Sequence, residues 1–240
     1  MSDAPFQAYG PSHLIVLGLT ALGVGVMCYA SRRKVTGLQL TAERLLAFVL
    51  FSEWPANMAV AYSTGEFTRE VMLPAHLCDV AALLGGVALL TRRPVICELL
   101  YFWGLAGTLQ GLLTPALDHD FPHPRFFTFF ALHSGVVMAA LYVVLGLGIT
   151  PRRGGVGRAF FWILAYAGVA GLIDSMTGAD YGFLRAKPEQ HSLLDFLGPW
   201  PWYIVGLILV SVIFFVVLDL PWWWKRRGSR GAEVVSPPGN

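Results

Sequence analysis

Seven stretches of predominantly apolar residues constrain this chain more than any other feature of its sequence. They run over residues 12–30, 43–62, 71–90, 94–113, 126–148, 159–177 and 201–220. A helix rises about 1.5 Å per residue, so a stretch of about 20 apolar residues matches the roughly 30 Å hydrocarbon core of a bilayer. The pattern predicts an all-α polytopic membrane protein built as a bundle of seven transmembrane helices.

Composition and the absence of familiar motifs narrow the class further. The 240 residues are 55% hydrophobic and 13% charged, with a mean hydropathy of +0.59, which excludes an ordinary soluble domain. The three cysteines, Cys28, Cys78 and Cys97, form no CxxC or Cys/His cluster, so no disulfide or zinc framework is predicted. No phosphate-binding loop, HExxH or GxSxG motif is present, so no cofactor is indicated. The net charge of +2 is too small and too dispersed to indicate a nucleic-acid partner.

The positively charged residues predict the orientation of the bundle. Most of the 17 Lys and Arg residues fall in every second connection, which places the N-terminus outside and the C-terminus in the cytoplasm. The residues predicted to lie inside are Arg32, Arg33, Lys34, Arg44, Arg92, Arg93, Arg152, Arg153, Arg158, Lys225, Arg226, Arg227 and Arg230, and those outside are Arg69, Arg125, Arg185 and Lys187. Residues 1–224 form one seven-span transmembrane domain, and residues 225–240 are a basic tail predicted to be disordered.

Three polar side chains are predicted to share one layer of the membrane. Cys78 and His133 each lie about seven residues, or roughly 10 Å, from the predicted outer ends of their spans. Glu53 lies at a similar depth in the second span. Ionisable groups within a span cost roughly 2.5–3.5 kcal/mol each, so they usually face the bundle interior and mark a site. A cavity open toward the outer leaflet is therefore expected.

The residue types in this layer are those of acyl transfer. A buried thiol needs a base to become a nucleophile, and His133 is the candidate base for Cys78. Glu53 would orient the imidazole as the third member of a triad. The predicted function is a lipid acyltransferase or acyl hydrolase. It would move an acyl chain from a membrane phospholipid to a lysophospholipid or to water through an acyl-Cys78 intermediate. The oligomeric state stays open.

Other polar residues near the outer surface are candidates for substrate binding. His76 is separated from Cys78 by about 200° around a helix, so it is a weaker candidate for the base, although the supporting group could be Glu53, Asp79 or His76. The outer loop 178–200 is interpreted as an interfacial lid, with lipid-phosphate binding by its cations as the alternative. The substrate-binding candidates are His76, Asp79, Gln110, Asp174, Tyr181, Arg185 and Lys187.

The polar loop 114–125 has two interpretations. It contains Asp118, His119, Asp120 and His123, whose spacing is loose. A solvated loop is preferred and no metal site is predicted, although a bound metal stays open as the alternative.

Two other functions fit the same residues. In a transporter or receptor-like binding protein, Glu53, His133 and Asp174 would bind a small ligand or relay protons. In a scaffold, the buried polar groups would only hold helices together. The three hypotheses differ at Cys78, which only the enzyme requires.

Several short motifs resemble one family of bacterial integral membrane proteins. They are residues 73–79 (LPAHLCD), 97–105 (CELLYFWGL), 113–115 (LTP), 130–133 (FALH), 179–184 (ADYGFL), 187–188 (KP) and 197–201 (LGPWP). Together they resemble the YwaF-like proteins, which are similar to eukaryotic seven-span acyltransferases that remodel ether phospholipids with a cysteine and a histidine. The resemblance implies that Cys78 accepts the acyl chain with His133 as its partner, in the bacterial inner membrane.

Overall fold

The protein is a bundle of helices, seen in a computed structural model that describes residues 5–187 and 193–234. The described chain contains no strand longer than an isolated bridge. The long helices are α1 (Pro11–Arg32), α2 (Thr36–Thr64), α3 (Leu77–Thr91), α4 (Pro94–Trp103), α6 (Pro124–Leu145), α7 (Gly155–Thr177) and α8 (Trp202–Val234). Helix α4 continues through η2 (Gly104–Thr108), a π-helical segment, into the short α5 (Leu109–Leu113). The predicted all-helical class is confirmed.

Six of these helical stretches are long and apolar enough to cross a membrane within the described residues. They are Pro11–Arg32, Thr36–Thr64, Pro94–Leu113, Pro124–Leu145, Gly155–Thr177 and Trp202–Arg227. The third predicted span differs, because its helix begins at Leu77 and not near residue 71. Its 15 residues extend only about 22 Å, less than the roughly 30 Å core of a bilayer. The prediction of seven full-length transmembrane helices is therefore confirmed only for six.

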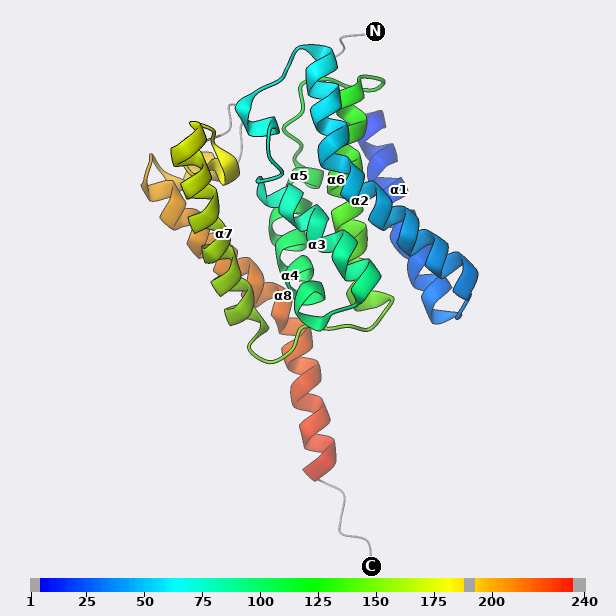
Figure 1. Cartoon of the computed structure of the whole chain (residues 1–240). Coiled ribbons are helices and arrows are strands. Elements are labelled where there is room, and N and C mark those ends of the chain that lie inside the picture. The colour runs from blue at the N-terminus through cyan, green and yellow to red at the C-terminus, as the bar shows by residue number, and fades with distance from the viewer. Residues whose placement is uncertain (1–4, 188–192, 235–240) are drawn as a thin grey trace, which may run out of the picture.

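The helices form a packed centre with two flanks (Figure 1). Helices α2, α3 and α6 pack against one another in the centre, and α4 also lies against α3 and α6. Helix α1 packs on α2 and α6 at one flank, while α7 and α8 pair with each other at the opposite flank. The largest apolar cluster is contributed by α2, α3, α4 and α6, and it includes Leu50, Leu100 and Val136. The flanking helices α1, α7 and α8 are exposed along much of their length.

The non-helical chain that precedes α3 is tied down by two tyrosines. The Tyr181 hydroxyl donates to the Arg69 carbonyl at 2.7 Å and accepts from the Leu73 amide at 3.2 Å. The Tyr166 hydroxyl donates to the Ala75 carbonyl at 2.9 Å. Backbone polar groups without a helix are tolerated at membrane depth only where protein groups satisfy them. The sequence pattern had placed residues 71–76 in a helix, because their composition is apolar and their bonding partners lie far away in the chain.

Helix α8 also differs from the prediction at its C-terminal end. It continues without a break through Lys225 to Val234, where a disordered tail was expected from residue 225. The disorder of the basic tail stays a prediction. Residues 235–240 of the predicted tail lie outside the described residues.

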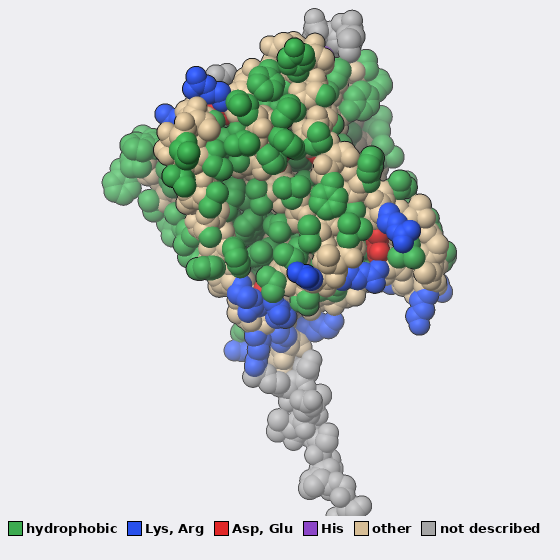
Figure 2. All heavy atoms as spheres, in the orientation of Figure 1, with side chains coloured by type: hydrophobic (Ala, Val, Ile, Leu, Met, Phe, Trp, Pro, Cys, Tyr) green, Lys and Arg blue, Asp and Glu red, His purple; other side chains and the backbone are tan. Residues whose placement is uncertain are grey.

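Positive charge gathers at the end of the molecule from which α8 projects (Figure 2). Two buried carboxylates at this end are fully paired. Glu43 on α2 accepts from Arg92 at 2.9 and 3.0 Å and from the Tyr142 hydroxyl at 2.5 Å. Glu98 on α4 accepts from Arg158 at 2.7 and 2.9 Å and from the Arg152 amide at 2.9 Å.

Candidate functional site

Cys78 lies in the first turn of α3. Because this helix begins at Leu77, Cys78 is its second residue and is not seven residues inside a span, as the sequence analysis estimated. Asp79 belongs to the same turn, where its Oδ2 accepts from the His76 amide at 3.2 Å and caps the helix. The half-buried Cys78 side chain lies close to the hydroxyl of Thr108, which is fully buried. Apart from this thiol, the Thr108 hydroxyl has no hydrogen-bond partner among the described residues.

His133 is the tenth residue of α6, and the protein holds its ring in one orientation. Its Nδ1 lies 2.7 Å from the carbonyl oxygen of Phe129, and its ring stacks on the Phe129 ring with centroids 4.1 Å apart. A carbonyl oxygen only accepts hydrogen bonds, so Nδ1 carries the proton and Nε2 keeps a free lone pair. The unprotonated Nε2 is the nitrogen that a general base requires.

One helical turn touches both Cys78 and His133. Thr108 lies close to the Cys78 thiol, and Gly111 lies against the imidazole of His133. A Cβ atom at Gly111 would stand 2.5 Å from Cδ2 and 2.6 Å from Nε2 of that ring, so only glycine leaves room for it. Residues three apart in a helix share a face, so Thr108 and Gly111 present both side chains to one side of this span.

Thr108 is also the last residue of a segment that departs from α-helical geometry. Residues Gly104–Thr108 form the π-helical segment η2, and such single-turn π segments are frequent at functional sites. Gly104 and Gly111 both pack closely on α6. Helix α3 also packs directly on α6. Cys78 and His133 therefore project from neighbouring helices.

The structure places Glu53 differently from the expected triad. Glu53 is buried on α2 and lies beside Asp79, whereas the Nδ1 partner of His133 is the Phe129 carbonyl. No hydrogen bond in the described chain joins Cys78 to His133 or Glu53 to His133. Catalytic hydrogen bonds are often long in unliganded proteins and tighten only when substrate is bound. Glu53 instead interacts electrostatically with the half-buried carboxyl group of Asp79, which belongs to the same helical turn as Cys78.

Two of the predicted substrate-binding residues hold the loop that follows α7. Asp174 accepts from the Tyr181 amide at 2.8 Å through Oδ1, and its Oδ2 is buried without a partner among the described residues. Tyr181 is fully buried and supports the chain before α3, as described above. Its ring meets the ring of His76 edge-on, with centroids 5.2 Å apart. These three residues therefore shape the wall beside the first turn of α3.

The cations of the outer loop are occupied by protein groups. Arg185 donates to the carbonyls of Asp174 and Ala179 at 3.4 and 3.3 Å. The Lys187 ammonium lies 5.6 Å from the centroid of the Tyr203 ring. Gln110 lies between Thr108 and Gly111 in sequence and is half-buried. Binding of a lipid by these three residues stays a prediction.

Sequence reasoning missed the residues that connect the candidate pair. Thr108 and Gly111 belong to an apolar span, where a threonine and a glycine are common and carry no signal by themselves. The one available signal was the glycine spacing of residues 104–111 (GLAGTLQG), which allows neighbouring helices to approach closely. The contacts of Thr108 with Cys78 and of Gly111 with His133 become visible only in the tertiary structure, where α3 and α6 pack beside this span.

Comparison with known proteins agrees with a membrane protein. An uncharacterized protein of Treponema pallidum (strain Nichols) is 27% identical over 165 residues, which covers 68% of this chain and 67% of that protein. No solved structure matches the chain. The family model of the TMEM164 family matches residues 8–219, which span all the described helices except the end of α8. The six apolar helices and this match together show an integral membrane protein, and the chain belongs to the TMEM164 family.

Proposed function

We propose that this protein transfers acyl chains from membrane phospholipids through Cys78, with His133 as the base. The observation that carries the proposal is the convergence of both side chains on one turn, Thr108–Gly111. The free Nε2 of His133 supports a basic role, and the π segment beside it supports a functional one. The YwaF-like resemblance of the motifs favours the same chemistry.

The reaction would proceed in two balanced steps. In the first, the Cys78 sulfur attacks the ester carbonyl carbon of a phospholipid while its proton passes to Nε2 of His133. The glycerol oxygen leaves with that proton, which releases a lysophospholipid and an acyl thioester on Cys78. In the second step, the hydroxyl of an acceptor lysolipid or of water gives its proton to Nε2 and attacks the thioester. The Cys78 thiol then takes the proton back.

The surroundings give the remaining residues their proposed parts. Asp79 lies next to the thiol, and Asp79 together with Glu53 would place polar groups near the ester. His76, Tyr181 and Asp174 would line the wall through which the lipid headgroup enters. Gln110, Arg185 and Lys187 are the proposed contacts of the phosphate, for which Arg185 and Lys187 would exchange their present protein partners.

The proposal includes a topology. The short α3 and the non-helical chain before it would together make the seventh crossing. The N-terminus would then lie outside a bacterial inner membrane, with the positively charged end of the bundle in the cytoplasm. This arrangement would put Cys78 beneath the outer headgroups, at the depth of the phospholipid ester bonds.

Intact-mass analysis tests the proposal directly. The purified full chain is incubated in detergent with a phospholipid of defined acyl chains, and we expect an added mass of one acyl group that hydroxylamine removes. Cys78→Ala should lose the adduct entirely. Cys28→Ala is the matched control, because Cys28 is also half-buried in an apolar helix, and it should keep the adduct. Absence of the adduct from the wild type, or its survival in Cys78→Ala, would overturn the proposal.

The transporter hypothesis has less support from the geometry. It needs Glu53, His133 and Asp174 to share one ligand site. Asp174 on α7 bonds the Tyr181 amide, whereas His133 on α6 contacts Gly111, and no contact joins the two groups among the described residues. The interaction of the Glu53 and Asp79 carboxyl groups is the feature that favours proton or cation binding. Retention of such binding by Cys78→Ser without any acyl adduct would favour this hypothesis.

A further inference from the structure

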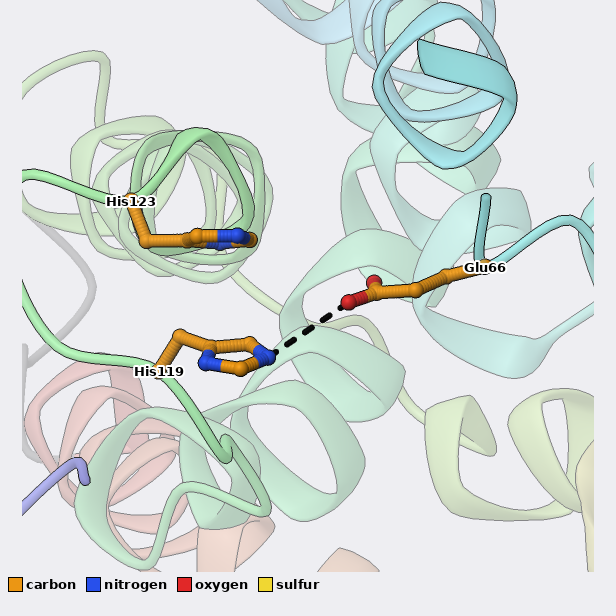
Figure 3. Close-up of side chains that lie close together, drawn as sticks. All are labelled: Glu66, His119 and His123. Atoms are coloured by element: carbon orange, nitrogen blue, oxygen red, sulfur yellow. Dashed lines mark ion pairs between the residues drawn. The ribbon is translucent and has the colours of Figure 1, made fainter. Parts of the chain in front are cut away.

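A cluster of three metal-ligating side chains lies away from Cys78, at the end of the bundle opposite the positively charged end. Glu66 follows the C-terminus of α2, and His119 and His123 come from the loop between α5 and α6. One ligand atom from each lies within 4.8 Å of the others, and Figure 3 shows the carboxylate pointing toward the two rings. No other group of three such residues occurs in the described part of the chain.

The distances are close to those of a metal site. Zinc bonds to histidine nitrogen and carboxylate oxygen are about 2.0–2.2 Å, so two ligands of a tetrahedral site stand roughly 3.3 Å apart. Nε2 of His119 and Oε1 of Glu66 are 3.4 Å apart, which matches that spacing. The rings of His119 and His123 stack with centroids 4.2 Å apart. Only small rotations of these side chains would bring the third ligand atom to the same distance.

Neighbouring groups hold parts of the cluster in place. The Arg125 guanidinium donates to Oε2 of Glu66 at 2.7 Å, which leaves Oε1 to face the histidines. The Arg125 amide donates to Nδ1 of His123 at 3.3 Å, so in the neutral ring the proton sits on Nε2. Metal binding through Nε2 therefore requires this ring to give up the long Nδ1 contact and change tautomer. The backbone of His119 is fixed by a bridge to Pro5.

Arg125 is itself held by protein groups beside the cluster. Its Nε donates to Oε2 of Glu66 at 2.7 Å and its Nη1 donates to Oδ1 of Asn57 at 3.0 Å, so Oε1 is the Glu66 oxygen left for a metal.

We propose that Glu66, His119 and His123 bind one divalent transition-metal ion of the zinc class. Two imidazoles and one carboxylate are a donor set that zinc accepts, with the fourth position open to water. The bound ion would join the end of α2 to the loop before α6, two segments separated by more than 50 residues in the sequence. This ion is independent of the acyl transfer proposed above.

The experiment measures metal binding by the full chain without a polyhistidine tag. The protein is purified in detergent with chelator, freed of chelator and titrated with Zn²⁺ by calorimetry, and Co²⁺ is used as a spectroscopic probe. We expect one ion per chain. His119→Ala combined with His123→Ala should weaken binding by at least 100-fold, and Glu66→Gln by about 10-fold. Asp120→Asn is the matched control, because Asp120 is a carboxylate of the same loop outside the cluster, and it should bind as the wild type does.

Thermal unfolding separates loss of the site from loss of the fold. We expect Zn²⁺ to raise the unfolding midpoint of the wild type and of Asp120→Asn and to leave that of the double histidine variant unchanged. The double variant should unfold at the same temperature as the metal-free wild type. Absence of stoichiometric binding by the wild type, or equal binding by the double histidine variant, would overturn the proposal.

Discussion

The two buried glutamates Glu43 and Glu98 differ from the polar groups around Cys78 in how they are paired. Glu43 and Glu98 are each satisfied by an arginine and by a further donor. Nε2 of His133 makes no hydrogen bond within the described residues, and the buried Thr108 hydroxyl has only the Cys78 thiol beside it. Glu53 interacts with another carboxyl group, that of Asp79.

This difference distinguishes polar groups that stabilise the fold from polar groups whose hydrogen-bonding capacity is left unused by the protein. Burying a charge is costly unless it is paired, so paired carboxylates are what a structural role requires. An unpaired buried donor or acceptor costs roughly 1–3 kcal/mol, and it persists where another function needs it. The comparison therefore assigns Glu43 and Glu98 to stability and supports the proposal that the surroundings of Cys78 serve chemistry.

Among the tests of this comparison, we expect replacement of His133 to have the largest effect. His133→Gln keeps a polar side chain but removes the base, so the initial rate of Cys78 acylation should fall about 10²–10⁴-fold. Intact-mass spectrometry over time measures this rate, and the unfolding midpoint should stay close to that of the wild type. A variant that unfolds readily yet acylates at the normal rate would show that His133 belongs with the structural groups.

The second test compares a paired carboxylate with an unpaired one. Glu98→Gln removes the charge that receives Arg158 and the Arg152 amide, so we expect unfolding to become easier by about 2–3 kcal/mol. Arg158 is partly exposed, and water would compensate some of the loss. Glu53→Gln loses no hydrogen bond and should change stability by less than about 1 kcal/mol. Denaturant unfolding in detergent measures both values, and equal losses would break the comparison.

The third test displaces the imidazole without altering its chemistry. Gly111→Ala puts a Cβ within 2.6 Å of Nε2 of His133, so the ring must move. A shift of about 1 Å can cost about 10²-fold in rate. We expect acylation to slow by about 10- to 100-fold. The matched control is Gly168→Ala on α7, where a Cβ would meet no atom within 4 Å, and its rate should equal that of the wild type.

The smallest expected effect concerns the wall beside Cys78. Tyr181→Phe removes a hydroxyl that bonds the Arg69 carbonyl and the Leu73 amide. Loss of these bonds should lower the free energy of unfolding by about 1–3 kcal/mol. It should also loosen the chain before α3, which hydrogen exchange at Leu73 would detect. Tyr62→Phe is the control, because Tyr62 is 81% exposed, and a similar loss there would contradict the assignment.

Much of the fold was predictable from apolar runs. Five of the predicted spans agree closely in position with observed helices, because an apolar stretch of membrane length has few alternatives to a helix. Residues 72–76 were equally apolar but are not helical, and Val71 only ends a short 3-10 turn, Arg69–Val71. Their backbone is satisfied by hydroxyls from α7 and the loop after it, and partners so distant leave no mark on the local sequence.

The sequence alone determined that this chain is a helical membrane protein and which few polar residues it places in apolar surroundings. Hydrophobicity and helix length are local properties, so they can be read along the chain. Only the tertiary structure decided that Thr108 and Gly111 stand between Cys78 and His133, and that the carbonyl of Phe129 orients the imidazole. It also brought Glu66 to His119 and His123. Such contacts depend on helix rotation and packing, which apolar runs leave undetermined.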